Sequence, residues 1–78
     1  MNDDGQAMKA FSKTLCRQDH TIRYSISMTP DGWEVREERD NHVVKQVRYQ
    51  DWHRVERARA SIATELRELQ GAGWAETN

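Results

Sequence analysis

Cysteine and proline each occur only once among the 78 residues, and the chain has no long apolar run. The single cysteine, Cys16, cannot form an intrachain disulfide, so disulfides do not hold this chain together. No segment has the length and apolar character of a membrane-spanning helix, and none shows the basic start and apolar core of a secretory leader. We therefore expect a cytoplasmic protein with no membrane partner.

An excess of charge of one sign is also lacking. Twelve Lys and Arg stand against thirteen Asp and Glu, which gives a formal net charge of -1, and the two signs are interspersed along the chain. This removes the bulk electrostatic argument for nucleic acid or an anionic membrane as a partner. A chain of 78 residues forms one domain that buries roughly 60% of its unfolded surface, which leaves little room for a deep catalytic cavity.

The chain does contain the material for a small core. Hydrophobic residues make up 36% of it and charged residues 32%, with three tryptophans. This composition is typical of a small globular protein rather than a disordered one.

Three segments have the alternation of apolar and polar side chains that is typical of half-buried strands. Residues 21–28 alternate strictly, and residues 33–38 and 43–49 follow the same period of two. In the third segment Val43 is expected on the face of Val47 and Tyr49, although a register error of one residue would turn Tyr49 outward. The shared apolar face then carries Ile22, Tyr24, Ile26, Met28, Trp33, Val35, Val47 and Tyr49.

The sequences between these segments are turn sequences. Residues 29–32 read Thr-Pro-Asp-Gly, with proline early and glycine last, which is typical of a type I turn. Residues 39–42 contain Asp40 and Asn41, two residues that tolerate the left-handed backbone. We therefore predict a three-stranded antiparallel β-meander that needs cover on one face.

A long C-terminal helix is predicted to supply that cover. Asp51 is a good N-cap, and an apolar stripe follows at helical spacing. If Gly73 is the left-handed residue after the helix, Trp74 packs on Leu69 in a Schellman ending at about Ala72. The alternative ending at Gly71 would pair Ala72 with Arg67, which offers less contact. The stripe consists of Val55, Ala58, Ile62, Leu66 and Leu69.

The first twenty residues are predicted to be an arm outside the main domain. Met8, Phe11 and Leu15 have the spacing of one short amphipathic helix over about residues 6–16. A helix this short is marginal in water, so docking and disorder are equally open. The predicted fold is thus α+β, a βββα domain at 21–78 behind an arm at 1–20.

Catalytic and metal-binding patterns are missing from the sequence. His53 has Glu56 and Arg57 on its helical face, and the arginine would repel a metal ion. His20 and His42 have no ligand at a suitable spacing, and no motif places a base beside Cys16. No glycine-rich loop precedes a helix as a phosphate cradle would. We expect no enzyme activity, no cofactor and no metal.

One basic residue on each predicted strand forms a candidate contact stripe for nucleic acid or another partner. Arg23, Arg36 and Arg48 fall on the polar face, and Lys45 is a further cation nearby. Single-stranded nucleic acid also needs aromatic stacking platforms, and the aromatic residues fall on the covered face. Because Glu34 and Glu38 share the polar face, cross-strand ion pairs are the favoured interpretation.

The charges of the predicted helix run against its dipole. Arg54 and Arg57 lie near the N-terminal end, and Glu65 and Glu68 lie near the C-terminal end. An antiparallel pair of such helices across a two-fold axis would set the basic half of one chain against the acidic half of the other. The alternative is that exposed charges are weakly constrained and carry no role.

The sequence therefore favours a small non-enzymatic binding or homodimerisation module. Its first expected partner is a second copy of itself, with another protein also open. The alternative hypothesis is binding of single-stranded DNA or RNA through the basic residues of the sheet.

Overall fold

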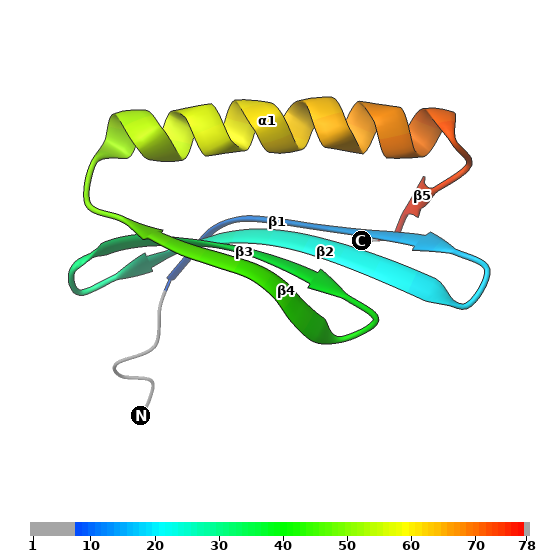
Figure 1. The fold of residues 1–78 in the computed structure, drawn as a ribbon, viewed down its shortest axis with the longest axis horizontal. Helices are drawn as coiled ribbons and strands as arrows, with labels where there is room; N and C mark the ends of the chain where they lie inside the picture. Colours follow the sequence, from blue (N-terminus) through cyan, green and yellow to red (C-terminus); the bar gives the residue numbers. More distant parts are fainter. Residues whose placement is uncertain (1–7, 78) are drawn as a thin grey trace.

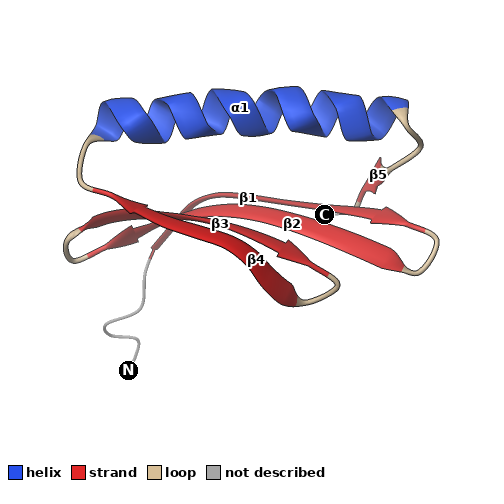
Figure 2. Ribbon diagram, in the orientation of Figure 1, coloured by secondary structure: helices blue, strands red, loops and turns tan. Residues whose placement is uncertain are grey.

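The computed structural model describes residues 8–77, which form one antiparallel sheet with a single helix across one face (Figure 1). The sheet has five strands in the order β4-β3-β2-β1-β5. The α+β class and the covering helix are confirmed, whereas the three-stranded count is wrong (Figure 2). The elements are β1 Met8–Arg17, β2 His20–Thr29, β3 Gly32–Arg39, β4 His42–Tyr49, α1 Trp52–Gly71 and β5 Ala75–Glu76.

The predicted N-terminal helix is a strand, and the part of the predicted arm at 1–7 lies outside the described residues. Phe11 pairs with Ile26 and Leu15 with Ile22, so β1 extends the sheet beside β2. Two features obscure the apolar–polar alternation of β1 in the sequence. A bulge shifts the register between Lys9 and Phe11, and Lys13 interrupts the apolar series on the covered face. A ladder along β2 satisfies the backbone of β1, which a short isolated helix could not match in stability.

Both predicted turns are present as two-residue connections between strands. Asp40 and Asn41 have φ values of 51° and 69°, which confirms the left-handed backbone expected of them. Gly32 has φ 150°, and a Cβ placed on it would lie 2.3 Å from the carbonyl oxygen of Tyr49. A glycine is required there because β4 passes so close to the start of β3.

The register of β4 differs from the prediction at its first half. Val43 pairs with Glu38 and Lys45 with Glu37, so a bulge lies between these two pairs. Val43 therefore lies on the face turned away from α1, 50% exposed, and its predicted place beside Val47 is wrong. Val47 and Tyr49 pair with core residues of β3 and keep the predicted face.

The core lies between α1 and the middle of the sheet. Val55 and Ile62 of α1 are buried against the central strands, which confirms the predicted apolar stripe. Each fully buried large aliphatic side chain contributes about 1.5–3 kcal/mol relative to an exposed one. The sheet supplies Ile22, Tyr24, Ile26 and Val35 to this cluster.

Both ends of α1 have the predicted caps. The Asp51 side chain accepts a hydrogen bond from the His53 N–H at 2.9 Å. At the other end the Trp74 N–H donates to the Leu69 carbonyl at 3.0 Å, and Gly73 has φ 103°. This is the Schellman ending, and it turns the chain back so that β5 can pair with β1.

Candidate functional site

The face of the sheet turned away from α1 carries the three predicted arginines in an alternating network of ion pairs. Glu34 lies 3.2 Å from Arg36 and 3.7 Å from Arg48. Glu38 lies 3.8 Å from Arg36 and 3.9 Å from Arg23. The structure brings Arg23, Arg36 and Arg48 together, and it also provides the cross-strand ion pairs that the sequence favoured.

Lys45 is not part of this group. Its partner across the ladder is Glu37, and Glu37 in turn pairs with the core residue Tyr24. Directly paired residues share a face of the sheet, so Lys45 lies on the α1 side. Regular alternation is the reason, because Lys45 precedes Val47 and Tyr49 by two and four residues and no bulge lies between them.

Stacking platforms are missing from the arginine face. Tyr24 is 2% exposed, and Trp33 and Tyr49 are half-buried on the α1 side. None of the described strands places a Trp, Tyr or Phe side chain on the opposite face. Base stacking on that face therefore has no platform within residues 8–77.

A second feature is a groove between α1 and β4. Its volume is about 400 Å³, and it has walls from both elements. Lys45, Val47 and Tyr49 line it from the strand. The helix lines it with Arg54, Arg57, Ser61 and Glu65, so this side of α1 faces β4. At steps of three and four residues these four side chains follow one side of the helix, and Glu68 continues the row.

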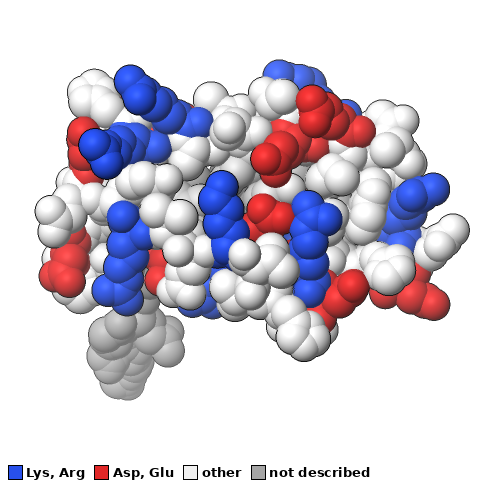
Figure 3. Space-filling model, viewed as in Figure 1, with Lys and Arg blue, Asp and Glu red and all other residues white. Residues whose placement is uncertain are grey.

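We call this row the α1 flank; its members are Arg54, Arg57, Ser61, Glu65 and Glu68. The structure thus brings all four charged residues of the predicted dimer contact onto one side of one helix. Figure 3 shows the basic side chains near the start of α1 and acidic ones farther along it. In the described part of the chain none of the four forms an intrachain ion pair.

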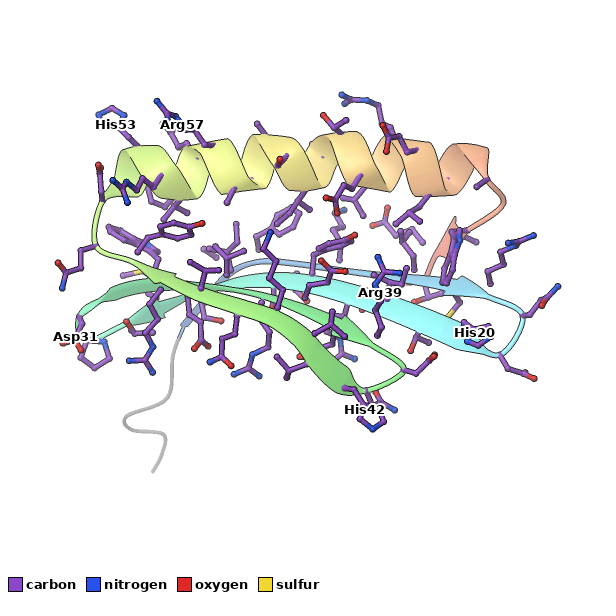
Figure 4. The ribbon with its side chains drawn as sticks, in the orientation of Figure 1. His20, Asp31, Arg39, His42, His53 and Arg57 are labelled. Carbon is purple, nitrogen blue, oxygen red and sulfur yellow. The ribbon has the colours of Figure 1, made fainter. Side chains whose placement is uncertain are left out.

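The acidic half of the α1 flank is tied to the core by one hydrogen bond. The Tyr24 hydroxyl donates to Glu65 Oε1 at 2.7 Å. Burial, and then the bond to Glu65, raise the pKa of Tyr24 far above its ordinary value. Nearby, Arg39 contacts Glu37 at 2.8 Å on the same side of the sheet (Figure 4). Glu65 is therefore held in place and keeps its second oxygen for other contacts.

The β4 strand forms an open edge of the sheet. Within residues 8–77 its outer side has no strand partner, and Val43 and Val44 are 50% and 54% exposed. At the opposite edge β5 pairs with Leu15 and Cys16 of β1. This asymmetry does not follow from the sequence pattern, which indicates neither β1 nor β5 as a strand.

The histidines lie away from the groove. His20 Nδ1 is 3.1 Å from Asp40 Oδ2, and His42 Nδ1 is 3.0 Å from the Asp40 carbonyl, so two hairpin ends meet at one residue (Figure 4). A hydrogen bond from the Thr21 N–H, and then His20, lower the pKa of Asp40. His53 is exposed on the first turn of α1. No group of three potential ligands with metal-binding geometry occurs in the described chain.

Comparison with known proteins gives no assignment. No family model, no curated protein and no solved structure matches the chain. Among the described residues, no helix is long and apolar enough to cross a membrane.

Proposed function

We propose that this chain is a non-enzymatic homodimerisation module whose two α1 helices lie antiparallel across a two-fold axis. The observation that carries the proposal is the order of charges on the α1 flank. Arg54 and Glu68 each lie seven residues from Ser61, on opposite sides of it, and Arg57 and Glu65 each lie four residues from it. A two-fold axis near Ser61 sets each arginine opposite a glutamate of the second copy.

The intrachain energetics support this role for the α1 flank. Arg54 in the first turn of α1 and Glu68 in its last turn each oppose the helix dipole by about 0.3–1 kcal/mol. A second copy in antiparallel orientation offsets this cost because its potential is complementary along the whole flank. Such complementarity fixes orientation and speeds association more than it adds affinity.

Reversal of charge on one half of the α1 flank is the direct test. Arg54→Glu/Arg57→Glu makes the flank wholly acidic. Glu65→Arg/Glu68→Arg makes it wholly basic and also removes the Tyr24–Glu65 hydrogen bond, so circular dichroism first checks that this variant is folded. The wild type is expected to be a dimer by light scattering, more weakly associated at high salt. Each variant alone is expected to be a monomer, and an equimolar mixture of the two is expected to form a heterodimer.

A matched control separates local from net charge. Arg59→Glu/Arg67→Glu changes the net charge by the same amount as the acidic variant, but both residues lie on other sides of α1. This control is expected to keep the wild-type mass. A wild type that is monomeric at every concentration, or a dimer that survives both reversals, would overturn the proposal.

Nucleic-acid binding is a second candidate, favoured by one observation. Arg23, Arg36 and Arg48 follow one another across three adjacent strands on a single face, and the Arg48 side chain is 68% exposed. Fluorescence anisotropy with single-stranded DNA and RNA at low salt tests this candidate. Binding that weakens with salt and with Arg23→Ala/Arg48→Ala supports it, whereas an unchanged signal at low salt dismisses it.

A further inference from the structure

We infer that β4 pairs antiparallel with β4 of a second copy around the same two-fold axis, so that the two sheets join into one. This inference rests on the proposed homodimer and names the surface that makes its main contact. The α1 flank then orients the two copies, and the strand edges hold them together.

The two edges of the sheet differ in how open they are. β4 is an eight-residue strand whose outer N–H and C=O groups have no strand partner in residues 8–77. Such an edge is a template for pairing with another chain. The β1 edge is closed near its end by β5, and the Thr77 N–H donates to the Thr14 carbonyl at 2.9 Å. In the described chain β4 is thus the edge that is free along its whole length.

The exposure of the side chains along β4 also indicates that this strand is available to a second copy. The five residues from His42 to Gln46 are all exposed, and Val47 is the first half-buried residue of the strand. Val43 and Val44 are among the few large apolar side chains of the described chain that are more than a third exposed. Lys45 lines the groove beside α1, so its ammonium group does not stand in the path of an incoming strand.

The proposed two-fold axis passes near the middle of both α1 and β4. α1 runs back over the sheet in the direction opposite to β4 (Figure 1). Arg54 and Tyr49 line the same groove, so they mark one end of the overlap. Ser61 lies about 10 Å along the helix from Arg54, which corresponds to about three strand residues back from Tyr49. The axis through Ser61 therefore crosses β4 near Gln46, the centre of the strand.

This placement is compatible with the charges of the strand. An axis at Gln46 sets Lys45 opposite Val47 and Arg48 opposite Val44 of the second copy. An axis at Val47 sets Lys45 opposite Tyr49 and Arg48 opposite Gln46. Neither arrangement places two like charges directly opposite each other, which would be destabilising. The two grooves then lie side by side over one continuous sheet, and the basic half of each α1 flank faces the acidic half of the other.

Hydrogen–deuterium exchange with mass spectrometry tests the strand contact directly. The wild type at a dimeric concentration is compared with the Arg54→Glu/Arg57→Glu chain. Peptides from β4 are expected to exchange at least about tenfold more slowly in the dimer, because outward amides gain partners. Peptides from β2 are the internal control and are expected to match. Equal exchange in β4, with slower exchange confined to α1, would overturn the joined sheet and leave the dimer standing.

Disulfide cross-linking gives a second readout that also fixes the register. In a Cys16→Ser background, Gln46→Cys and Val47→Cys are oxidised separately. The variant whose new cysteine lies nearest the axis is expected to form a covalent dimer, because Cβ atoms of directly opposed residues lie about 4.5–5.5 Å apart. Ser12→Cys on β1 is the control and is expected to stay monomeric. A dimer that cross-links at neither strand position would overturn the inference, whereas a monomeric wild type would overturn the proposed function with it.

Discussion

The hydroxyl of Tyr24, at the centre of the sheet, donates a hydrogen bond 2.7 Å long to Glu65 on the α1 flank. This bond joins the core to the surface that we propose for self-association. It fixes where the acidic half of the flank lies above the sheet.

Removal of this bond is expected to destabilise the fold. Tyr24→Phe should lower the free energy of unfolding by about 1.5–3 kcal/mol, the range for a hydrogen bond to a charged group. Urea denaturation measures the change, with Tyr49→Phe as control because Tyr49 is half-buried and makes no such bond. Equal stability of Tyr24→Phe and wild type would show that the bond contributes nothing.

The same pair predicts a loss of stability at high pH. The pKa of Tyr24 in the folded chain is raised above its ordinary value of 10.0 by burial and by Glu65, so folding favours the neutral phenol. Its contribution is present below pH 10 and declines as the pH rises beyond that value, because the unfolded chain then ionises first. The stability difference between wild type and Tyr24→Phe should shrink from pH 9 to pH 11. A constant difference would contradict this.

The lowered pKa of Asp40 predicts the opposite pH dependence, a loss of folding stability in acid. Its pKa is lowered by the hydrogen bond from Thr21 and by His20, so the folded chain favours the carboxylate. The contribution is present above the ordinary pKa of 3.8 and is lost as the pH falls through the lower folded value. Asp40→Asn keeps the turn backbone and removes the charge. Acid unfolding followed by circular dichroism should show the wild-type advantage at pH 7 and none at pH 2.

Two glycines should respond to alanine in opposite directions. Gly32→Ala places a Cβ 2.3 Å from the Tyr49 carbonyl oxygen and should cost about 1–3 kcal/mol, as for other overpacked sites. Gly71→Ala meets nothing within 4 Å in the last turn of α1 and should stabilise by up to about 1 kcal/mol. Thermal and urea unfolding of both variants provide the comparison. A neutral Gly32→Ala would mean that β3 and β4 can separate there at little cost.

The glutamates on the sheet face turned away from α1 should reduce the access of ligands to the arginines of that face. Glu34 and Glu38 are half-buried beneath them and contact all three. Glu34→Gln/Glu38→Gln should raise the affinity for single-stranded DNA at low salt, because the freed arginines become available to phosphate. Anisotropy titrations measure the change, with Asp19→Asn/Glu56→Gln, two exposed residues away from that face and from the α1 flank, as a control for net charge. An equal gain in the control would assign the effect to net charge alone.

The sequence by itself determined the features that depend on near neighbours. The Asp51 cap and the Schellman ending at Gly73 involve residues within one or two helical turns, and the apolar stripe of α1 repeats at steps of three and four residues. The left-handed backbone of Asp40 and Asn41 is likewise a local preference. Local hydrogen bonds and steric limits act identically whatever the rest of the chain does, so the pattern alone predicts these elements.

Only the tertiary structure decided the role of β1 and the two faces of β4. Lys13 lies on the covered side of β1 because it pairs with Tyr24, and Glu76, far away in the sequence, contacts its ammonium group at 2.7 Å. One bulge in β4 moves Val43 to the face turned away from α1, whereas Lys45 keeps the face of Val47 and Tyr49. Strand pairing and bulges depend on partners that are distant along the chain, so a period of two cannot reveal them. The open β4 edge beside the α1 flank is a product of that pairing.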